Sequence, residues 1–424
     1  MRLPRTPLTD ALYGAGIRAY AAAVRAAGRR NRKARLMTDG QRRTWRELEK
    51  LDPERRVVWL HAASLGEFEQ GRPVIERIRT EMPDVQILLT FFSPSGYEVR
   101  RNYAGADVVC YLPFDTRANA RRLVREARPS MAIFVKYEFW RSYIRALAEA
   151  DVPTYLISAI FRPGQIFFRP WGRAYRNLLR LYDGIFVQDE GSRSLLAGIG
   201  TDSIVAGDTR FDRVAEIASR RRRAKELDAF LTEREMMLVV GSSWPADEDV
   251  YIPWLNSRPE AGAIIAPHEF DAARLKDLRR RIKGGAVLLS ELGENPERGA
   301  HAQAVIIDCF GLLSSLYAYA DVAYVGGGFG AGIHNINEAA VYGVPVLFGP
   351  NHSKFIEARE LIAAGGGFCV NSESDFAERA DNLLRDPESR EISGHASDAY
   401  IRSKLGATDA ILTTLLPRLR PALS

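Results

Sequence analysis

The stretch that most constrains the fold is residues 322–350, VAYVGGGFGAGIHNINEAAVYGVPVLFGP. Its first four residues are short and apolar, which is typical of a buried parallel strand. Five glycines follow between Gly326 and Gly332, and they let backbone N–H groups approach a ligand because no side chain intervenes. A short helix is expected over Ala339–Tyr342, where Gly343 ends it, and the next strand over Val344–Phe348. The pattern predicts a strand, loop, helix and returning strand of one parallel sheet.

Two interpretations of the glycine loop are open from the residues alone. A glycine loop that leads into a helix N-terminus binds anions, because unpaired N–H groups and the helix dipole both favour negative charge. Glu338 would then lie in the first helical turn and accept hydrogen bonds from ribose hydroxyls. The alternative is a tight crossover that needs glycine only for packing. The HNxxE run from His334 to Glu338 favours a nucleotide, although the spacing matches neither a dinucleotide fingerprint nor a P-loop.

Length and composition indicate an ordinary two-domain globular protein. The chain has 424 residues, of which 46% are apolar and 26% charged, so long disordered segments are not expected. The three cysteines, Cys110, Cys309 and Cys369, are odd in number and form no CxxC pair. This pattern predicts a reducing compartment and no metal cluster. No signal peptide is expected.

Positive charge gathers at the N-terminus. Residues 1–50 contain 13 Lys or Arg against 4 Asp or Glu, whereas the whole chain carries a net charge of +6. Apolar residues recur at roughly helical spacing from Leu8 to Val24, and arginines flank them. This helix is too charged to span a bilayer, and an amphipathic helix on an anionic membrane is one interpretation. A solvated helix packed on its own domain is the other.

Strands and helices alternate from residue 57 onward, which predicts two doubly wound α/β domains with ligands at the carboxyl ends of the strands. The expected strands of the first half are Val57–Leu60, Ile87–Phe92, Val108–Leu112, Met131–Val135, Thr154–Ser158, Gly184–Val187 and Asp202–Val205. Those of the second half are Met237–Val240, Gly262–Ala266, Ala286–Leu289, Ala304–Ile307, Val322–Val325 and Val344–Phe348. Residues 213–235 are densely charged and are expected to be helical, with Arg220–Arg223 on a solvated face rather than a nucleic-acid contact.

Candidate catalytic side chains follow the strands of the first half. Glu67 comes just after the first strand and is either a general base or a carboxylate that complements the helix dipole. Glu138 follows the fourth strand and supplies a second carboxylate. Arg210 follows the last strand and offers a cation to a leaving phosphate. Ser93 and Ser95 indicate a turn and helix cap that holds an acceptor group.

Residues 161–182 interleave arginines, among them Arg162, with aromatic side chains. Such a surface suits phosphates beside an apolar tail. Stacking on single-stranded nucleic acid and the charged outer face of a core helix are the two alternatives.

The joint order and spacing of six motifs resembles the 3-deoxy-D-manno-octulosonic acid (Kdo) transferases of lipopolysaccharide biosynthesis, over essentially the full chain. The motifs are HAASLGE at 61–67, FSPSG at 92–96, YEFW at 137–140, GDTRFD at 207–212, VGGGFGAGIHNINEAA at 325–340 and PVLFGP at 345–350. The resemblance implies a GT-B fold, in which two Rossmann-like domains face a central cleft. It also implies inverting transfer of Kdo from CMP-Kdo to a lipid A precursor, with no metal or other cofactor and no nucleic-acid partner. The expected place is the cytoplasmic face of the bacterial inner membrane.

The resemblance also implies residue roles. Glu67 would be the base, and Glu138 and Arg210 would stabilise the transition state. The expected CMP-binding residues are Pro267, His268, Phe310, Gly311, Leu312, Gly327, Gly328, Asn335, Ile336, Asn337 and Glu338. The expected acceptor-binding residues are Ser64, Gly66, Ser93, Ser95 and Arg162. The chain departs from the family pattern at Arg210, where many members have lysine, and at Ala266-Pro267-His268, where many have Pro-Arg-His.

The expected domain limits follow from these assignments. They are a basic membrane-associating helix at 1–36, an acceptor-binding domain at 37–212, a charged helical linker at 213–235, a CMP-sugar domain at 236–405, and a helix at 406–424 that packs back on the N-terminal domain. Two other functions are weighed against Kdo transfer. One is a GT-B enzyme that uses a UDP-sugar, and the other is a non-catalytic protein that binds a membrane surface or nucleic acid through its basic segments.

Overall fold

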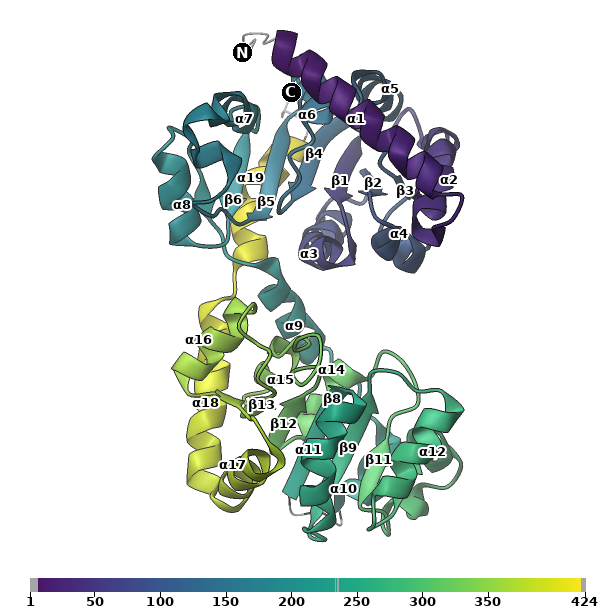
Figure 1. Cartoon of the computed structure of the whole chain (residues 1–424), viewed down its shortest axis with the longest axis vertical. Coiled ribbons are helices and arrows are strands. Elements are labelled where there is room, and N and C mark those ends of the chain that lie inside the picture. The colour runs from purple at the N-terminus through teal and green to yellow at the C-terminus, as the bar shows by residue number, and fades with distance from the viewer. Residues whose placement is uncertain (1–6, 233, 235, 421–424) are drawn as a thin grey trace. The chain divides into compact units, whose positions relative to one another are not determined.

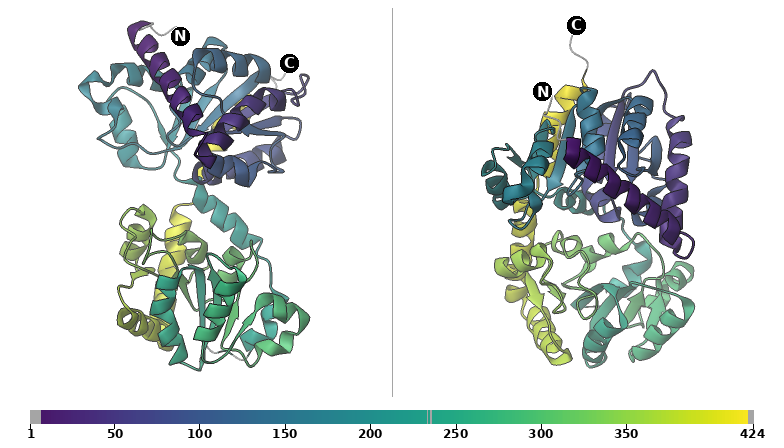
Figure 2. Two further views of the ribbon diagram at one scale, coloured as in Figure 1. Left: turned by 45° about the vertical axis from the view of Figure 1, so that its right-hand side comes forward. Right: turned by 45° about the horizontal axis from the view of Figure 1, so that its top comes forward.

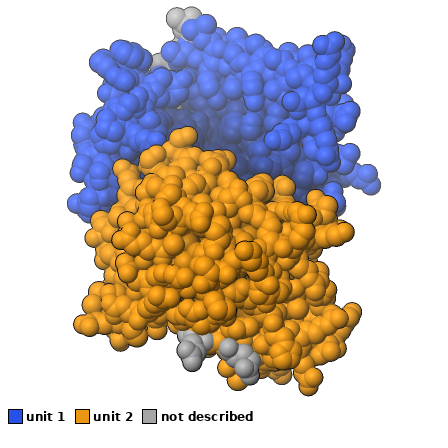
Figure 3. All heavy atoms as spheres, turned by 60° about the horizontal axis from the view of Figure 1, so that its bottom comes forward, with its two compact units in different colours: residues 1–212, 405–424 blue, residues 213–404 orange. Residues whose placement is uncertain are grey.

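The computed structural model describes residues 7–232, 234 and 236–420 (Figure 1). The chain divides into two compact units. Unit 1 comprises Met1–Asp212 and Leu405–Ser424, and unit 2 comprises Arg213–Lys404 (Figure 3). Of the expected domains, residues 1–6, 233, 235 and 421–424 lie outside the described residues.

Unit 1 contains a seven-stranded parallel sheet with strand order β3-β2-β1-β4-β5-β6-β7. Its strands are β1 Val57–Ala62, β2 Gln86–Phe91, β3 Val108–Tyr111, β4 Pro129–Val135, β5 Thr154–Ala159, β6 Gly184–Val187 and β7 Ile204–Val205. Its helices are α1 Pro7–Ala27, α2 Arg32–Leu48, α3 Leu65–Glu81, α4 Pro94–Arg100, α5 Arg117–Ala127, α6 Arg141–Glu149, α7 Arg173–Leu179, α8 Glu190–Ala197 and α19 Ala407–Leu419, with 3₁₀ turns at Ile166–Phe168 and Pro170–Gly172. Because the chain runs outward from β1 to β3 and then returns to β4, the topological switch point lies between β1 and β4.

Both faces of this sheet are covered, which explains why its strands are continuous apolar runs (Figure 2). Trp59 and Phe134 belong to one core cluster together with residues of α5 and α6. Leu60 and Ile133 belong to the other, which residues of α3 and α19 complete. The last helix of the chain is therefore part of the core of unit 1.

Helix α1 is fastened to unit 1 by polar and apolar contacts. The Tyr13 hydroxyl donates to Asp115 Oδ2 at 2.5 Å, and Asp10 pairs with Arg145 at 2.5 Å and with Arg141. Ala21 lies in a small buried cluster with Phe114. The outer face of α1 exposes Leu12, which is 65% accessible, and Tyr20, which is 48% accessible. The interpretation of α1 as a helix that packs on its own domain thus holds for one of its faces. In the described part of the chain, no helix is long and apolar enough to cross a bilayer.

Unit 2 contains a second seven-stranded parallel sheet, with order β10-β11-β9-β8-β12-β13-β14. Its strands are β8 Met236–Ser243, β9 Ala261–Pro267, β10 Ala286–Leu288, β11 Ala304–Ile306, β12 Val322–Val325, β13 Val346–Phe348 and β14 Gly367–Cys369. Its helices are α10 Asp228–Thr232, α11 Pro245–Asn256, α12 Ala272–Arg281, α13 Leu289–Glu294, α14 Leu313–Leu316, α15 Asn337–Ala340, α16 Ile356–Ala364, α17 Glu373–Arg385 and α18 Pro387–Ser403, and α9 Thr209–Ser219 spans the boundary of the two units. Short 3₁₀ turns occur at Lys225–Leu227, Pro296–Gly299 and Tyr317–Tyr319. The switch point of this sheet lies between β8 and β12.

The expected helical linker at 213–235 is wrong as a continuous helix. Helix α9 ends at Ser219, and the basic run Arg220–Arg223 lies in a turn and a non-helical stretch. The backbone N–H of Arg222 donates to Ser315 Oγ at 3.2 Å, and that of Ala224 donates to Tyr319 Oη at 3.0 Å. Side-chain acceptors of unit 2 therefore replace the helical carbonyl partners that the charge pattern predicted.

Candidate functional site

The switch point of unit 1 holds a buried histidine–carboxylate pair. His61 is the penultimate residue of β1 and has no exposed surface, while Glu138 follows β4 and is 6% exposed. His61 Nε2 lies 3.1 Å from Glu138 Oε2, and Trp140 Nε1 donates to the same oxygen. The Tyr182 hydroxyl donates to the backbone carbonyl of Glu138 at 2.7 Å. Glu138, predicted from its position after a strand, is thus held in one place by side chains from three segments.

Glu67 lies in the first turn of α3 and is partly exposed. The Ser64 hydroxyl donates to Glu67 Oε2, so the residue before the helix orients the carboxylate. Burial raises the pKa of the Tyr137 hydroxyl, which the positive charge of Arg162 lowers and the negative charge of Glu67 raises further. These electrostatic contacts place Glu67, Tyr137 and Arg162 along one edge of the sheet, where the sequence predicted a base beside an acceptor site.

Arg210 is linked to helix α3, which also carries Glu67, through the carboxylate of Asp208. Its Nε and Nη2 donate to Asp208 Oδ2 at 2.9 and 2.7 Å. Gln70 Nε2 in turn donates to both oxygens of the buried Asp208, at 3.2 and 3.1 Å. The Thr209 hydroxyl donates to the Gln70 carbonyl. Because Gln70 follows Glu67 by three residues, α3 positions the predicted base and anchors the loop that carries the predicted cation.

The other predicted acceptor residues lie on neighbouring loops of this edge. Ser93 caps α4, and its backbone N–H donates to the Ala63 carbonyl at 2.7 Å, which joins the loops after β1 and β2. Ser93 Oγ and Ser95 Oγ lie 3.0 Å apart. Ser64 and Gly66 belong to the loop and first turn that carry Glu67. Arg162 follows β5, so all the predicted acceptor residues lie after the carboxyl ends of strands of the same sheet.

In unit 2 the glycine loop is anchored by a buried carboxylate that sequence reasoning missed. Asp247 has no exposed surface and accepts hydrogen bonds from the backbone N–H groups of Trp244 and Gly327, each at 2.9 Å. It also accepts from the Tyr324 hydroxyl at 2.9 Å. Asp247 thus joins the end of β8, the strand β12 and the loop after β12. A carboxylate four residues after the end of β8 was the available signal.

Packing accounts for three of the loop glycines. A Cβ on Gly326 would lie 2.4 Å from the Ser242 carbonyl oxygen, and one on Gly328 would lie 2.5 Å from Gly349 Cα. Gly327 has φ +94°, a conformation that side chains disfavour. The helix after the loop, α15, covers Asn337–Ala340 and so begins two residues before the expected helix over 339–342. Four residues form about one helical turn and add little dipole. Backbone N–H groups remain as donors, since those of Gly328 and Phe329 have no hydrogen-bonding partner among the described residues.

Glu338 lies beside the loop with two polar neighbours. Asn335 Nδ2 donates to Glu338 Oε1 at 3.1 Å, and the Ser314 hydroxyl donates to Oε2. Asn337 is 1% exposed, and its Oδ1 has no partner in the described part of the chain. Ile336 is fully buried, so it offers a ligand only its backbone.

Three rings form a stack at the same edge of unit 2. Trp244 stacks on His268 at 4.4 Å and His268 on His334 at 4.6 Å, between ring centroids. Trp244 Nε1 donates to His334 Nε2 at 3.3 Å, which assigns the proton of a neutral His334 to Nδ1. Burial and the neighbouring His268 lower the pKa of His334, and Asp247 acts in the opposite direction. Near pH 7 His334 is therefore a neutral ring.

The remaining predicted donor residues occupy adjacent strand ends. Pro267 ends β9 and His268 follows it, while Phe310, Gly311 and Leu312 follow β11. Phe310 is 85% exposed and packs against Phe270 at 4.5 Å, and Gly311 has φ +86°. The structure thus brings the expected CMP-binding segments to one edge of unit 2, on β9, β11 and β12.

Left-handed backbone marks the ends of three strands. Lys136 (φ 70°) follows β4, Ser158 (φ 50°) lies at the end of β5, and Ser242 (φ 54°) lies near the end of β8. The registers of β5 with β6 and of β8 with β9 shift at these places. Such conformations cost free energy and gather at functional sites. These left-handed residues support the carboxyl ends of the strands of both sheets as the location of the functional sites.

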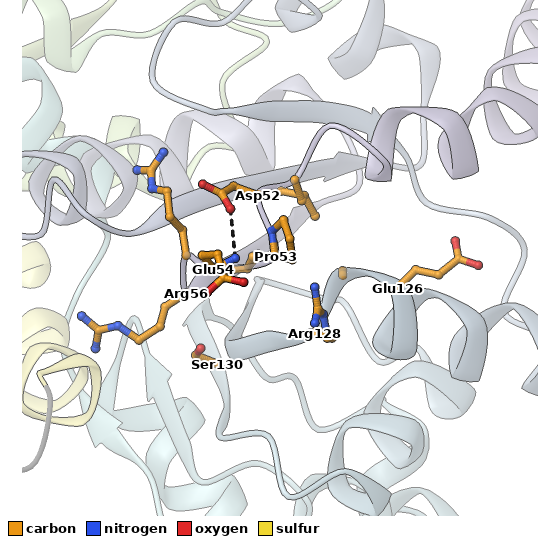
Figure 4. Close-up of a pocket in the computed structure, with 11 residues that line it drawn as sticks. Asp52, Pro53, Glu54, Arg56, Glu126, Arg128 and Ser130 are labelled. Carbon is orange, nitrogen blue, oxygen red and sulfur yellow. Dashed lines mark hydrogen bonds between the residues drawn. The ribbon is translucent and has the colours of Figure 1, made fainter.

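A cavity of about 210 Å³ lies elsewhere in unit 1 (Figure 4). Arg55, Arg56, Arg128 and Ser130 are among the residues that line it, and they lie at the amino ends of β1 and β4. Since the predicted catalytic residues occupy the carboxyl ends, this cavity is separate from the candidate site. Among the described residues, no group of three His, Cys, Asp or Glu side chains is placed to hold a metal ion.

Comparison with known proteins agrees with the arrangement. Residues 33–213 match the family described as 3-deoxy-D-manno-octulosonic-acid transferase (kdotransferase). The chain is 28% identical to a 3-deoxy-D-manno-octulosonic acid transferase of Chlamydia muridarum, over 82% of each chain. It is 27% identical to the protein of that name from Bordetella pertussis, over 84% of this chain and 86% of that one.

Solved structures of similar fold include UDP-GlcNAc 2-epimerase from Neisseria meningitidis, with a TM-score of 0.58 and 16% identity over 85% of this chain and 100% of that one. MurG from Acinetobacter baumannii has a TM-score of 0.51 and 11% identity, over 86% and 99% of the two chains. At these identities the likeness shows the fold alone, and that fold is of the GT-B type.

The packing of the glycine loop gives a first prediction. Gly328→Ala places a methyl group against the Gly349 backbone and should lower the free energy of unfolding by about 1–3 kcal/mol. Gly330→Ala is the matched control, because its new Cβ would be 3.6 Å from the nearest atom, and it should change stability by less than about 0.5 kcal/mol. Thermal unfolding of both variants measures the difference, and equal stabilities would contradict the packing assignment.

Proposed function

We propose that the chain is a member of the 3-deoxy-D-manno-octulosonic-acid transferase family and that it transfers Kdo from CMP-Kdo to a lipid A precursor in lipopolysaccharide biosynthesis. It is a glycosyltransferase of the GT-B fold class. The observation that carries the proposal is the placement of Glu67, Glu138 and Arg210 on one sheet edge of unit 1. That edge holds a base, a fixed carboxylate and a cation, which are the groups that a sugar transfer with a phosphate leaving group needs.

We assign the donor to the carboxyl edge of unit 2. Ribose hydroxyls would take the place of the Ser314 and Asn335 donors on Glu338, because a carboxylate accepts from two neighbouring hydroxyls. The free N–H groups of Gly328 and Phe329 would donate to the phosphate. The stacked rings of Trp244 and His268 offer an aromatic surface for the cytosine base or the sugar.

The reaction in this proposal is a single displacement. Glu67 takes the proton of an acceptor hydroxyl as its oxygen bonds to the anomeric carbon of Kdo, and the bond from that carbon to the phosphate oxygen breaks. The leaving group is CMP, whose negative charge Arg210 stabilises. Attack opposite the leaving group inverts the anomeric configuration. The loop N–H groups of unit 2 donate to the phosphate, and the proposal includes no metal ion or other cofactor.

We further assign the acceptor and the membrane surface to unit 1. The segment after β5 presents Arg162, Arg169 and Arg173 beside Trp171, which is 71% exposed. Arginine pairs with phosphate, and tryptophan favours the boundary of water and lipid. Together with the exposed Arg18 and Arg25 of α1, this surface supports peripheral attachment to the cytoplasmic face of the inner membrane, where an anionic lipid acceptor lies.

Product analysis tests the function directly. Incubation of the full chain with CMP-Kdo and a tetra-acylated lipid A precursor should give a product heavier by one or more Kdo residues in mass spectrometry, also in the presence of EDTA. Parallel reactions with UDP-sugars test the alternative donor. Sugar transfer from a UDP-sugar but not from CMP-Kdo would overturn the proposal.

The assignment of Glu67 as base gives a specific prediction. Glu67→Gln keeps the shape of the side chain but cannot accept the proton, so kcat should fall by roughly 10²–10⁴ while CMP affinity changes little. Glu81→Gln, at the far end of the same helix, is the control and should retain activity. Mass spectrometry and calorimetry with CMP measure the two effects. An active Glu67→Gln enzyme would remove Glu67 from the mechanism.

The ribose assignment is tested by binding alone. Glu338→Ala removes both acceptor oxygens and should weaken CMP binding at least about tenfold, since hydrogen bonds to a charged group are worth roughly 1.5–3 kcal/mol. The exposed Glu373→Ala at the start of α17 serves as the control. Isothermal calorimetry measures both. Unchanged CMP affinity in Glu338→Ala would place the ribose elsewhere.

A further inference from the structure

His61 is a fully buried imidazole that the mechanism above does not use. It is the penultimate residue of β1 and has no exposed surface, and the rings of Phe134 and Trp140 lie edge-on to it at 5.9 and 5.7 Å. A buried polar ring is stable only when its nitrogen atoms have hydrogen-bonding partners. Both nitrogen atoms of His61 have such partners, on opposite sides of the ring.

The partners on the Nδ1 side determine which nitrogen carries the proton. Nδ1 lies 2.8 Å from Thr90 Oγ1 and 3.1 Å from the Thr90 carbonyl oxygen. Trp59 Nε1 donates to Thr90 Oγ1 at 2.8 Å, and an indole N–H can only donate. The Thr90 hydroxyl accepts from Trp59 and keeps its own proton, which it can donate to His61 Nδ1 while Nε2 faces the carboxylate of Glu138. With Nδ1 as acceptor, a neutral imidazole carries its proton on Nε2.

The proton on Nε2 then points at the predicted catalytic carboxylate. His61 Nε2 donates to Glu138 Oε2 at 3.1 Å, and Trp140 Nε1 donates to the same oxygen. Two donors on one oxygen stabilise the ionised form of a carboxyl group and fix its orientation. The other tautomer would turn the lone pair of Nε2 toward Glu138 and repel its negative charge. The series of hydrogen bonds from Trp59 through Thr90 and His61 to Glu138 then has one donor and one acceptor in each bond.

We propose that Thr90 and His61 are positioning residues, which hold the Glu138 carboxylate in one orientation by fixing the Nε2–H tautomer of His61. The catalytic part of this inference rests on the proposed function, because it assumes that Glu138 stabilises the transition state. The tautomer itself does not depend on that function. Thr90 and His61 have no exposed surface, so they act through Glu138 rather than on the substrate.

Two substitutions at Thr90 distinguish the effect of its hydroxyl group from the effect of its methyl group. Thr90→Val keeps the shape but removes the hydroxyl, so the Thr90 carbonyl becomes the remaining partner of Nδ1. A carbonyl can only accept, and the proton should therefore move from Nε2 to Nδ1. Thr90→Ser keeps the hydroxyl and should keep the Nε2–H tautomer.

Nitrogen-15 NMR of the full chain with labelled histidine reads the tautomer without any substrate. The His61 signals are assigned by their loss in His61→Phe, among the 6 histidines of the chain. We expect a protonated Nε2 and an unprotonated Nδ1 in the wild type and in Thr90→Ser. A proton on Nδ1 of the wild-type protein, or protons on both nitrogen atoms at pH 7, would overturn the proposal even if Thr90→Val did not fold.

Kinetics test the consequence for catalysis. Thr90→Val should lower kcat about 10- to 100-fold, the loss expected when a charged group loses one hydrogen bond, with little change in the KM for CMP-Kdo. Thr90→Ser should recover most of the rate. A Thr90→Val enzyme with wild-type kcat would overturn the positioning role. If the wild type transfers no Kdo while NMR shows the expected tautomer, the proposed function fails and the assignment of the His61 proton stands.

Discussion

The structure depends on the geometry of parallel sheets, which bring the carboxyl ends of all their strands to one edge. Both faces of each sheet are covered by helices, so strands such as β1 and β12 are apolar and offer little chemistry along their length. Polar residues therefore follow the strands rather than lie within them. Where the chain reverses its direction of travel across the sheet, two loops diverge, and both units place their buried carboxylates, Glu138 and Asp247, beside that point.

These buried carboxylates are costly, and each is stabilised by donors fixed in the fold. Burial of an unpaired charge costs several kcal/mol, so Glu138 depends on His61 and Trp140. Asp247 depends on two backbone N–H groups and a tyrosine hydroxyl. The two sites differ in what the carboxylate does. Asp247 uses both oxygens to hold the glycine loop, whereas the partners of Glu138 in the described residues all bind Oε2.

Strand positions could be predicted from the sequence because the strands are buried runs of apolar residues. Gly184–Val187 and Val322–Val325 match the structure residue for residue, and the other predicted strands differ at their ends. The strand β14, Gly367–Cys369, was missed because three residues with a glycine carry no pattern. The predicted helical linker failed because charge density indicates exposure, not helix, and partners such as Ser315 are distant in sequence.

In the candidate site, too, local sequence predicted the positions of residues but not the contacts between residues that are distant in sequence. Motifs located Glu67, Glu138 and Arg210, since each follows a strand. The pairing of His61 with Glu138 could not be predicted, because these residues are 77 positions apart and meet only when β4 inserts beside β1, after two intervening strands. Gln70 and Asp208 are separated by 138 positions, so their contact was equally invisible.

The return of the chain to unit 1 has a consequence for biosynthesis. Helix α19 supplies Ile411, Leu412 and Leu415 to one face of the first sheet, and Asp212 accepts from the N–H groups of Gly406 and Thr408 at its start. On the ribosome, one flank of this sheet therefore lacks its cover until residues 405–420 have been made. The continuous stretch 213–404 can fold first, although it is translated second. Until then, the apolar side chains of the first sheet that pack against α19 lack that contact.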